Sequence, residues 1–265
     1  MMSAAPIICN IEDGWATIWL NRPEARNALS QELTDLLLST LQELSHDPDL
    51  RGITMRGRGG TFCAGGDIKG FKSNMQADGQ GHEDVARSSQ QAGELFACIN
   101  TFPHPVIMLV DGAAMAGGMG MVCAGDVVIV VENTKFALTE TTLGIPPAQI
   151  APFVLQRLGL STARRLMLTA ARFDGAEALR IGLADFAAPS LAEAELIEAR
   201  IRNDVKKCAP GANRITKDIV LAARYLQGEE MRAYAGEGFA RAMLSDEGRE
   251  GVSAFIEKRK PRWAQ

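Results

Sequence analysis

Two glycine-rich turns are the segments best suited to hold a reacting carbonyl group. The first is Thr61–Lys69 (TFCAGGDIK) and the second is Asp111–Gly120 (DGAAMAGGMG), and each follows a predicted strand and leads into a predicted helix. Glycine at such a turn frees backbone N–H groups and lets a ligand approach the main chain closely. Two N–H groups that face one point form an oxyanion hole, although two tight turns that serve packing alone would show the same pattern.

A glutamate between apolar residues is the candidate proton carrier. Glu140 lies in the segment Phe136–Pro147 (FALTETTLGIPP), between apolar strand residues and a turn that contains proline. Burial there would raise the pKa of its carboxyl toward the range useful for general acid–base catalysis. A glutamate that caps a helix or forms a surface ion pair would fit the same sequence.

Familiar nucleotide and metal motifs are absent. The segment Gly60–Gly65 has the glycine spacing of a P-loop, but Gly66 and Asp67 stand where Lys and Ser or Thr are required, and no dinucleotide fingerprint occurs. ATP and NAD are therefore not expected as cofactors. The 5 cysteines are scattered, and none of the 3 histidines lies within metal-ligand spacing of another, which argues against a disulfide framework or a zinc site.

Composition and charge narrow the class of protein further. The chain has 265 residues, of which 46% are hydrophobic and 23% charged, and its net charge is −4. This charge argues against broad capture of nucleic acid or of an anionic membrane surface. The N-terminus lacks the basic and apolar regions of a signal peptide, and the membrane-like window 113–131 is interrupted by Asp126 and by glycines. We expect a cytoplasmic protein without nucleic-acid or membrane partners.

The elements that must position these residues alternate between strand and helix in the first part of the chain. Strand–helix units in series predict an α/β layer structure with parallel strands. After Glu140 the pattern becomes mainly helical, so we predict a core over 1–190 and a helical C-terminal region over 191–265. The predicted strands are 7–10, 15–20, 52–56, 106–110, 127–131 and 184–187, and the predicted helices are 30–45, 85–100, a short one ending near 124, 150–158, 161–170, 175–181, 191–208, 213–226, 229–244 and 246–259.

The order and spacing of several stretches resemble the crotonase, or enoyl-CoA hydratase/isomerase, superfamily. The resemblance begins at Asn21–Leu29 (NRPEARNAL), includes both glycine turns and Asp126, and ends at Phe255–Pro261 (FIEKRKP). It implies a crotonase spiral of ββα units that form two roughly perpendicular sheets, followed by a helical C-terminal trimerisation region. It also implies a homotrimer or a dimer of trimers.

The resemblance implies roles for individual residues. The N–H groups of Gly66 and Gly117 would hold the thioester oxygen of an acyl-CoA, and Glu140 would act as the acid–base residue. Coenzyme A is part of the substrate, and no metal or redox cofactor is implied. The remaining implied residues contact coenzyme A: they are Ala64, Asp67 and Ile68, together with Lys258, which would reach the phosphates from a neighbouring subunit or else belong to a solvated helix end.

One departure from the family pattern concerns the second carboxylate of many hydratases. Its position is occupied by Gly120, so either Glu140 does the work of both carboxylates or a second group that positions water lies elsewhere. In Δ3,Δ2-enoyl-CoA isomerases, a single glutamate at the position of Glu140 moves a proton between carbons. Longer similarity, however, connects the chain with bacterial hydratases of 3-methylglutaconyl-CoA and isohexenylglutaconyl-CoA, through the stretches Pro147–Gly159, Leu168–Gly175 and Asp246–Gly251.

We therefore expect hydration of a branched glutaconyl-CoA thioester, in leucine or acyclic terpene catabolism. Gly120 and the nearby small residues Ala113, Ala114 and Ala116 predict open volume beside the reacting carbons, which favours the isohexenyl substrate. An RNA-binding relative without enzymatic activity is the third reading, and the negative net charge and the presence of only 2 tyrosines disfavour it.

Overall fold

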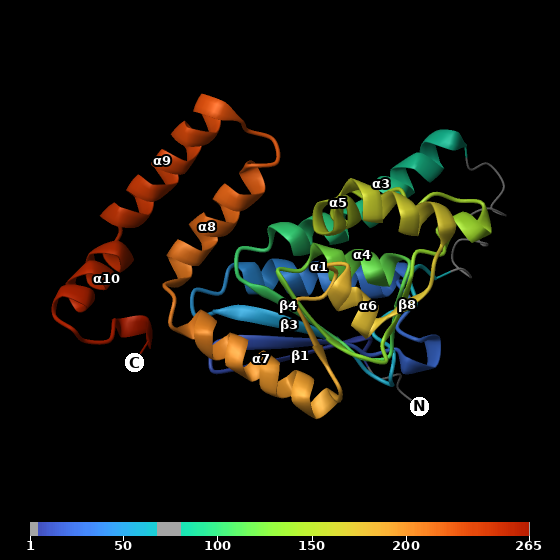
Figure 1. Cartoon of the computed structure of the whole chain (residues 1–265), viewed down its shortest axis with the longest axis horizontal. Coiled ribbons are helices and arrows are strands. Elements are labelled where there is room, and N and C mark those ends of the chain that lie inside the picture. Colours follow the sequence, from blue (N-terminus) through green and yellow to red (C-terminus); the bar gives the residue numbers. More distant parts are fainter. Residues whose placement is uncertain (1–4, 68–80, 265) are drawn as a thin grey trace.

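The computed structural model describes residues 5–67 and 81–264 and is built around one main sheet (Figure 1). β1 runs antiparallel to β2, and every other pair of neighbouring strands is parallel. Parallel neighbours require crossover connections, and helices supply them. The six strands lie in the order β1 (Ile7–Glu12), β2 (Trp15–Leu20), β3 (Gly52–Gly57), β4 (Val106–Val110), β6 (Val127–Val131) and β9 (Phe186–Ala188).

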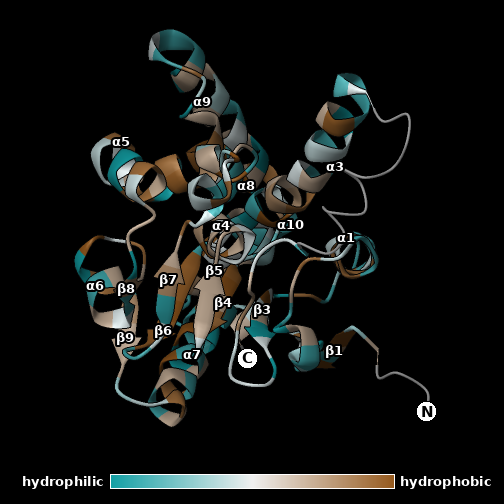
Figure 2. Cartoon of the chain, turned by 90° about the vertical axis from the view of Figure 1, so that its right-hand side faces the viewer, coloured by the Kyte–Doolittle hydropathy of each residue, from teal (hydrophilic) through white to brown (hydrophobic). Residues whose placement is uncertain are grey.

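Both faces of this sheet are covered, which explains the continuous apolar runs of its strands. In β4, Met108 belongs to the larger hydrophobic core, whereas Ile107 and Leu109 point to the opposite side. Figure 2 shows that the strands are coloured mainly hydrophobic. The larger core packs under α1 (Gln31–Ser45), α3 (His82–Thr101), α4 (Gly117–Ala124) and α5 (Ala151–Thr169), and the smaller core packs under α7 (Leu191–Lys206).

A second, small sheet lies beside the main one and carries the turns of interest. Its strands are β5 (Ala113–Met115), β7 (Lys135–Ala137) and β8 (Phe173–Asp174), and α6 (Gly175–Arg180) follows β8. β5 pairs with β7 in parallel, and β7 pairs with β8 antiparallel. The ring centroids of Phe136 and Phe173 lie 5.4 Å apart in a stacked arrangement that joins the last two strands.

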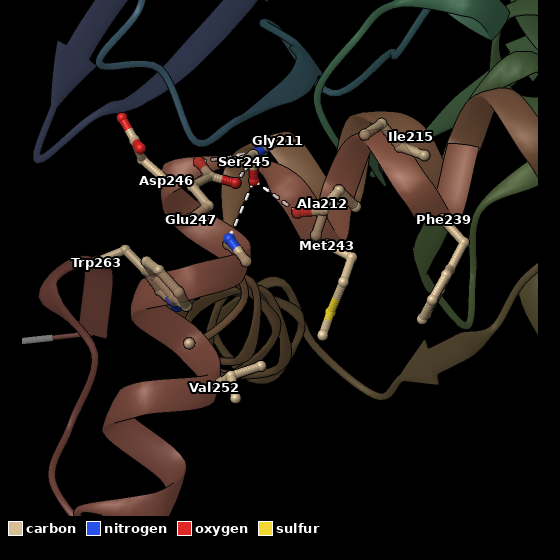
Figure 3. A pocket seen from close by; sticks show the side chains of 14 residues that line it. Gly211, Ala212, Ile215, Phe239, Met243, Ser245, Asp246, Glu247, Val252 and Trp263 are labelled. Carbon is tan, nitrogen blue, oxygen red and sulfur yellow. Dashed lines mark hydrogen bonds between the residues drawn. The ribbon is translucent and has the colours of Figure 1, made fainter. Parts of the chain in front are cut away.

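The C-terminal helices form an arm that extends away from the sheets (Figure 1). The arm consists of α8 (Pro210–Ala222), α9 (Gly228–Leu244) and α10 (Asp246–Ile256). Large apolar side chains on it face solvent, including Phe239 at 68% and Phe255 at 86% exposure. A cavity of about 500 Å³ lies between these helices and Trp263, and in Figure 3 the Gly211 N–H donates to the Glu247 carboxylate at its edge.

The α/β layer structure with parallel strands expected from the sequence is confirmed. The predicted strands and helices all occur, with shifts of a few residues at their ends, and the break predicted between 158 and 161 corresponds to a kink at Gly159 inside α5. The short strands β5 and β8 were not predicted. The division of the chain at residue 190 remains a prediction, and α7, the first helix after it, packs on the main sheet. No helix of the described residues is long and apolar enough to cross a membrane.

A buried histidine lies where the arm meets the main sheet. His104 precedes β4 and is only 3% exposed, its ring centroid lies 5.8 Å from that of Phe102, and its Nε2 finds no hydrogen-bond partner among the described residues. The pKa of His104 is lowered to about 4, mainly by burial and also by the positive charges of Arg214 and Lys217 on α8, whereas the negative charge of Asp47 acts in the opposite direction.

This environment predicts a pH-dependent stability. The folded state prefers neutral His104, whereas the unfolded chain binds the proton below about pH 6.5. Stability is therefore lost as the pH falls from about 6.5 toward the folded pKa of about 4. His104→Leu removes the group. Between pH 7 and pH 5, the melting temperature of the wild type should therefore fall by several degrees more than that of the variant, at about 2–4 °C per kcal/mol of stability lost. Equal losses in the two proteins would contradict the assignment.

Candidate active site

Three chain segments that run in the same direction end together at one edge of the small sheet. β5 pairs with β7 so that Met115 lies opposite Ala137, and on its other side Cys63 forms a parallel bridge with Ala114. The carboxyl ends of parallel segments meet at the same edge. The next residues along these segments include Gly66, Gly117 and Glu140, so the topology brings the three predicted site residues to one place.

In the first turn, the Gly66 N–H points away from the neighbouring segment at Leu29. The Leu29 N–H donates to the Gly65 carbonyl at 2.8 Å, and the Asp67 N–H donates to the Leu29 carbonyl at 3.1 Å. Because directions alternate along an extended chain, the intervening Gly66 N–H points the other way. Within the described part of the chain it has no hydrogen-bond acceptor.

The two glycine turns touch at Gly65. Its φ of 92° is a conformation that favours glycine. A Cβ atom there would lie 2.7 Å from Ala116 Cβ and 3.4 Å from Gly117 N, so no side chain fits between the turns. The close approach places the residue after Gly65 and the residue after Ala116 next to each other, and these are the two predicted donors.

The second donor opens helix α4. Ala116 has φ 50° and ψ −122°, and it is held in this conformation on both sides: its N–H donates to the Ala137 carbonyl at 2.8 Å and its carbonyl accepts from the Gly120 N–H at 3.0 Å. Gly117 is the first residue of α4, where backbone N–H groups have no partner inside the helix. The helix dipole adds positive potential at this end, which favours an oxyanion.

Glu140 opens a short 3-10 helix, Glu140–Leu143, just beyond the end of β7. Its side chain is half-buried, and Oε2 is inaccessible and finds no hydrogen-bond partner among the described residues. Burial raises the pKa of this carboxyl, and a hydrogen bond from its own backbone N–H opposes the rise. The Thr141 hydroxyl donates to the Met167 carbonyl at 3.1 Å and so connects this turn to α5. A half-buried carboxyl with a raised pKa can both accept and release a proton near neutral pH.

The expectation of open volume beside Gly120 is wrong. A Cβ on Gly120 would overlap the Ile150 side chain, with Ile150 Cβ at 2.7 Å, and would lie 3.3 Å from Phe96 Cε1. Both side chains are buried, because α3 and α5 close tightly over α4. The place of the missing carboxylate is therefore taken by an apolar wall.

Two of the other predicted residues lie on the first turn. Ala64 and Asp67 flank Gly66 on the first turn, and the Ala64 N–H donates to the Arg26 carbonyl at 3.0 Å. Ile68 lies outside the described residues. Lys258 is exposed and follows α10 in the arm, which Figure 1 shows on the far side of α8 from α4, so a single chain does not bring it to the other site residues.

Asn27 supports the first turn, a role that was not predicted from the sequence. It is fully buried with φ 55°, and its Nδ2 donates to the carbonyls of Arg58 at 2.9 Å and Thr61 at 2.7 Å. Its Oδ1 accepts from the Arg22 N–H at 2.8 Å. The position of Asn27 inside the stretch Asn21–Leu29 was the available signal, since a short polar side chain tolerates positive φ and can bond the backbone locally.

The contact at Gly120 leads to a stability prediction. Gly120→Ala should destabilise the protein by about 1–3 kcal/mol, because the added methyl group overlaps Ile150. In an Ile150→Ala background the same substitution should cost much less, since the overlapping atoms are gone. Denaturant unfolding of the four proteins of this cycle measures the coupling. Additive effects would show that Ile150 does not fill the space.

Known proteins match the chain over nearly its whole length. The family described as enoyl-CoA hydratase/isomerase matches residues 10–265. A putative enoyl-CoA hydratase of Thermus thermophilus is 33% identical over 250 residues, which cover 94% of this chain and 96% of that protein. A peroxisomal Delta(3,5)-Delta(2,4)-dienoyl-CoA isomerase of Arabidopsis thaliana is 32% identical over 257 residues, covering 93% of this chain and 91% of that protein.

The solved structure of Pseudomonas aeruginosa AtuE superposes with a TM-score of 0.94 at 41% identity, and the match covers 98% of this chain and 100% of that one. An enoyl-CoA hydratase/isomerase from Marinobacter aquaeolei superposes equally well, with a TM-score of 0.94 at 36% identity over 99% and 100% of the two chains. These matches over nearly the whole chain show that it belongs to the enoyl-CoA hydratase/isomerase family and has the crotonase fold expected from its sequence.

Proposed function

We propose that this protein is a hydro-lyase that adds water across the 2,3-double bond of a branched glutaconyl-CoA thioester. The observation that carries the proposal is the position of Glu140. Its half-buried carboxyl, with one unpartnered oxygen, lies at the sheet edge where the N–H groups of Gly66 and Gly117 also end. Relatives named as enoyl-CoA hydratases support hydration as the reaction type.

The proposed reaction uses one carboxyl twice. The Glu140 carboxylate takes a proton from water while the water oxygen bonds to C3. The electron pair of the double bond then moves to the thioester as an enolate, which the N–H groups of Gly66 and Gly117 stabilise. Glu140 returns the proton to C2, and the enolate becomes a thioester again. The sequence of steps consumes one water and leaves the protein unchanged, without a metal or redox cofactor.

The substrate class follows from the stretches that resemble hydratases of 3-methylglutaconyl-CoA and isohexenylglutaconyl-CoA. The argument from volume that favoured the longer isohexenyl branch no longer applies, because Ile150 and Phe96 occupy the space beside Gly120. The proposal is therefore made for the branched glutaconyl class. A homotrimer or a dimer of trimers would let Lys258 of one chain reach coenzyme A bound to another, together with Ala64, Asp67 and Ile68.

Isomerisation is the second candidate, and the apolar wall at Gly120 favours it. A single carboxyl is sufficient to remove a proton from C2 of a 3-enoyl thioester and deliver it to C4. In this reaction no water is added, so a second carboxylate at the position of Gly120 is not required. The relative from Arabidopsis thaliana that is named a dienoyl-CoA isomerase supports this candidate.

The mass of the product separates the two reactions. Incubation of the wild type with 3-methylglutaconyl-CoA or isohexenylglutaconyl-CoA should give a product heavier by one water. Glu140→Gln keeps the size of the side chain but cannot accept the proton, so we expect its kcat to fall by about 10²- to 10⁴-fold. A product of unchanged mass with a moved double bond would establish the isomerase instead.

The pH profile tests whether Glu140 acts as the base. Burial raises the pKa of Glu140 above its usual value of 4.5, and the base must be deprotonated to accept a proton from water. Activity should therefore decline as the pH falls through this raised pKa, so the acid limb of kcat/KM has its midpoint above 4.5. The limb should be absent from the residual activity of Glu140→Gln. An identical acid limb in the variant would assign the titration to another group.

A further inference from the structure

A narrow stripe of residues on helix α3 faces the interior of the protein and extends away from the turn at Gly117. In its first part, 82–94, every side chain is exposed except Ala86, Ser89 and Gly93. Their spacing of three and four residues places them on one face of the helix, and Phe96 continues it. The Phe96 ring lies 3.6 Å from where a Cβ on Gly117 would be, so the stripe begins at the second predicted donor and becomes polar at Ser89.

A residue from another element completes this face. Gln149 precedes Ile150, and its Nε2 donates to the Ser89 hydroxyl oxygen at 3.1 Å. Its amide lies directly against Gly93, where a Cβ would overlap Oε1 and lie 3.1 Å from Cδ. Two apolar side chains, Phe96 and Ile150, thus pack against Gly120, and a polar pair from the same two segments lies beyond them.

The spacing suits the far end of a short acyl group. Ser89 precedes Phe96 by seven residues, which corresponds to about 10 Å along the helix axis. The side chains of a helix lean toward its N-terminus, so the Phe96 ring covers part of this distance. An acyl group with its thioester oxygen at Gly117 would run past Phe96 and Ile150 and bring its distal end to Ser89 and Gln149.

The polar pair has hydrogen-bond donors available for a ligand. Ser89 uses its oxygen as an acceptor for Gln149, so its own O–H hydrogen and the second amide hydrogen of Gln149 have no acceptor within the described residues. These donor atoms lie 3.1 Å apart, and each can meet one oxygen of a carboxylate. Hydrogen bonds from neutral donors to a charged acceptor are stronger than those between neutral groups.

We infer that Ser89 and Gln149 form the specificity site for the distal carboxylate of the acyl group. The inference rests on the proposed function, because it concerns the acyl group whose thioester oxygen lies at Gly66 and Gly117. It identifies the two side chains that distinguish a glutaconyl thioester from one with an apolar end. Both are specificity-determining residues, and neither takes part in the proton transfers assigned to Glu140.

The test compares two thioesters that differ only at the distal end. One is 3-methylglutaconyl-CoA, and the other is 3-methylpent-2-enoyl-CoA, in which a methyl group replaces the carboxyl. Gln149→Leu and Ser89→Ala should each lower kcat/KM for the first thioester by about 10- to 100-fold and leave that for the second within about two-fold. Gly93→Ala should act in the same direction, because the new methyl group displaces the flexible Gln149 amide without removing a polar group.

Matched controls lie on the exposed side of the same helix. Ser88→Ala and Gln90→Leu make the same chemical changes at exposed positions and should alter neither thioester. A parallel loss for both thioesters in the Ser89 and Gln149 variants would indicate a purely structural role and overturn the inference, and so would an unchanged preference.

Binding measurements separate this inference from the proposed reaction. Calorimetric Kd values for the two thioesters should show a wild-type preference for the carboxylated one that Gln149→Leu abolishes. If the wild type turns over neither thioester but keeps this preference, the hydration proposal fails and the specificity site stands. If it hydrates both and binds them equally, the specificity site fails and the reaction stands.

Discussion

The parallel alignment of three short segments is the constraint on which the site depends. The bridge between Cys63 and Ala114 and the pairing of β5 with β7 make the two glycine turns and the Glu140 turn end at one edge. Each segment alone is too short to be stable, so the alignment has to be supported from outside. The main sheet supplies that support through the common hydrophobic core, to which both Cys63 and Phe136 belong.

The sequence predicted the large elements better than the contacts around the candidate site. Long apolar runs such as 106–110 and capped helices such as α1, where Ser30 accepts from the Leu33 N–H, have local signals. β5 and β8 span three and two residues, which is too few for any periodicity to emerge. Their pairing is decided by tertiary contacts.

The error at Gly120 has a similar origin. Glycine in place of a larger residue leaves room only if the neighbouring elements stay in position. Here Ile150, thirty residues later in the chain, and Phe96 on α3 fill the space. The pairing of Ser89 with Gln149 is equally nonlocal, since the two residues are separated by 60 positions. Neither contact has a signal in a single sequence.

The arm depends on a few polar contacts at its base. The Arg51 guanidinium donates to the carbonyls of Cys208 at 2.7 Å, Lys206 at 3.1 Å and Trp263 at 3.2 Å, which ties the end of α7 and the C-terminal segment to the start of β3. Lys217 on α8 contacts the Asp126 carboxylate at 2.7 Å. These contacts join the base of the arm to the body.

The N–H groups of Gly66 and Gly117, which we propose as the oxyanion donors, belong to the main chain, and this has an evolutionary consequence. A point mutation at either residue cannot delete the backbone N–H unless it introduces proline, so these donors would be lost through displacement of a turn, as a side chain at Gly65 would cause. The side chains of Ser89 on α3 and of Gln149 before α5, in contrast, form a hydrogen bond with each other. In such a scaffold, the proposed reaction centre can stay the same while the residues that contact the acyl group change during evolution. Substitutions of those side chains alone would then allow new acyl groups to bind.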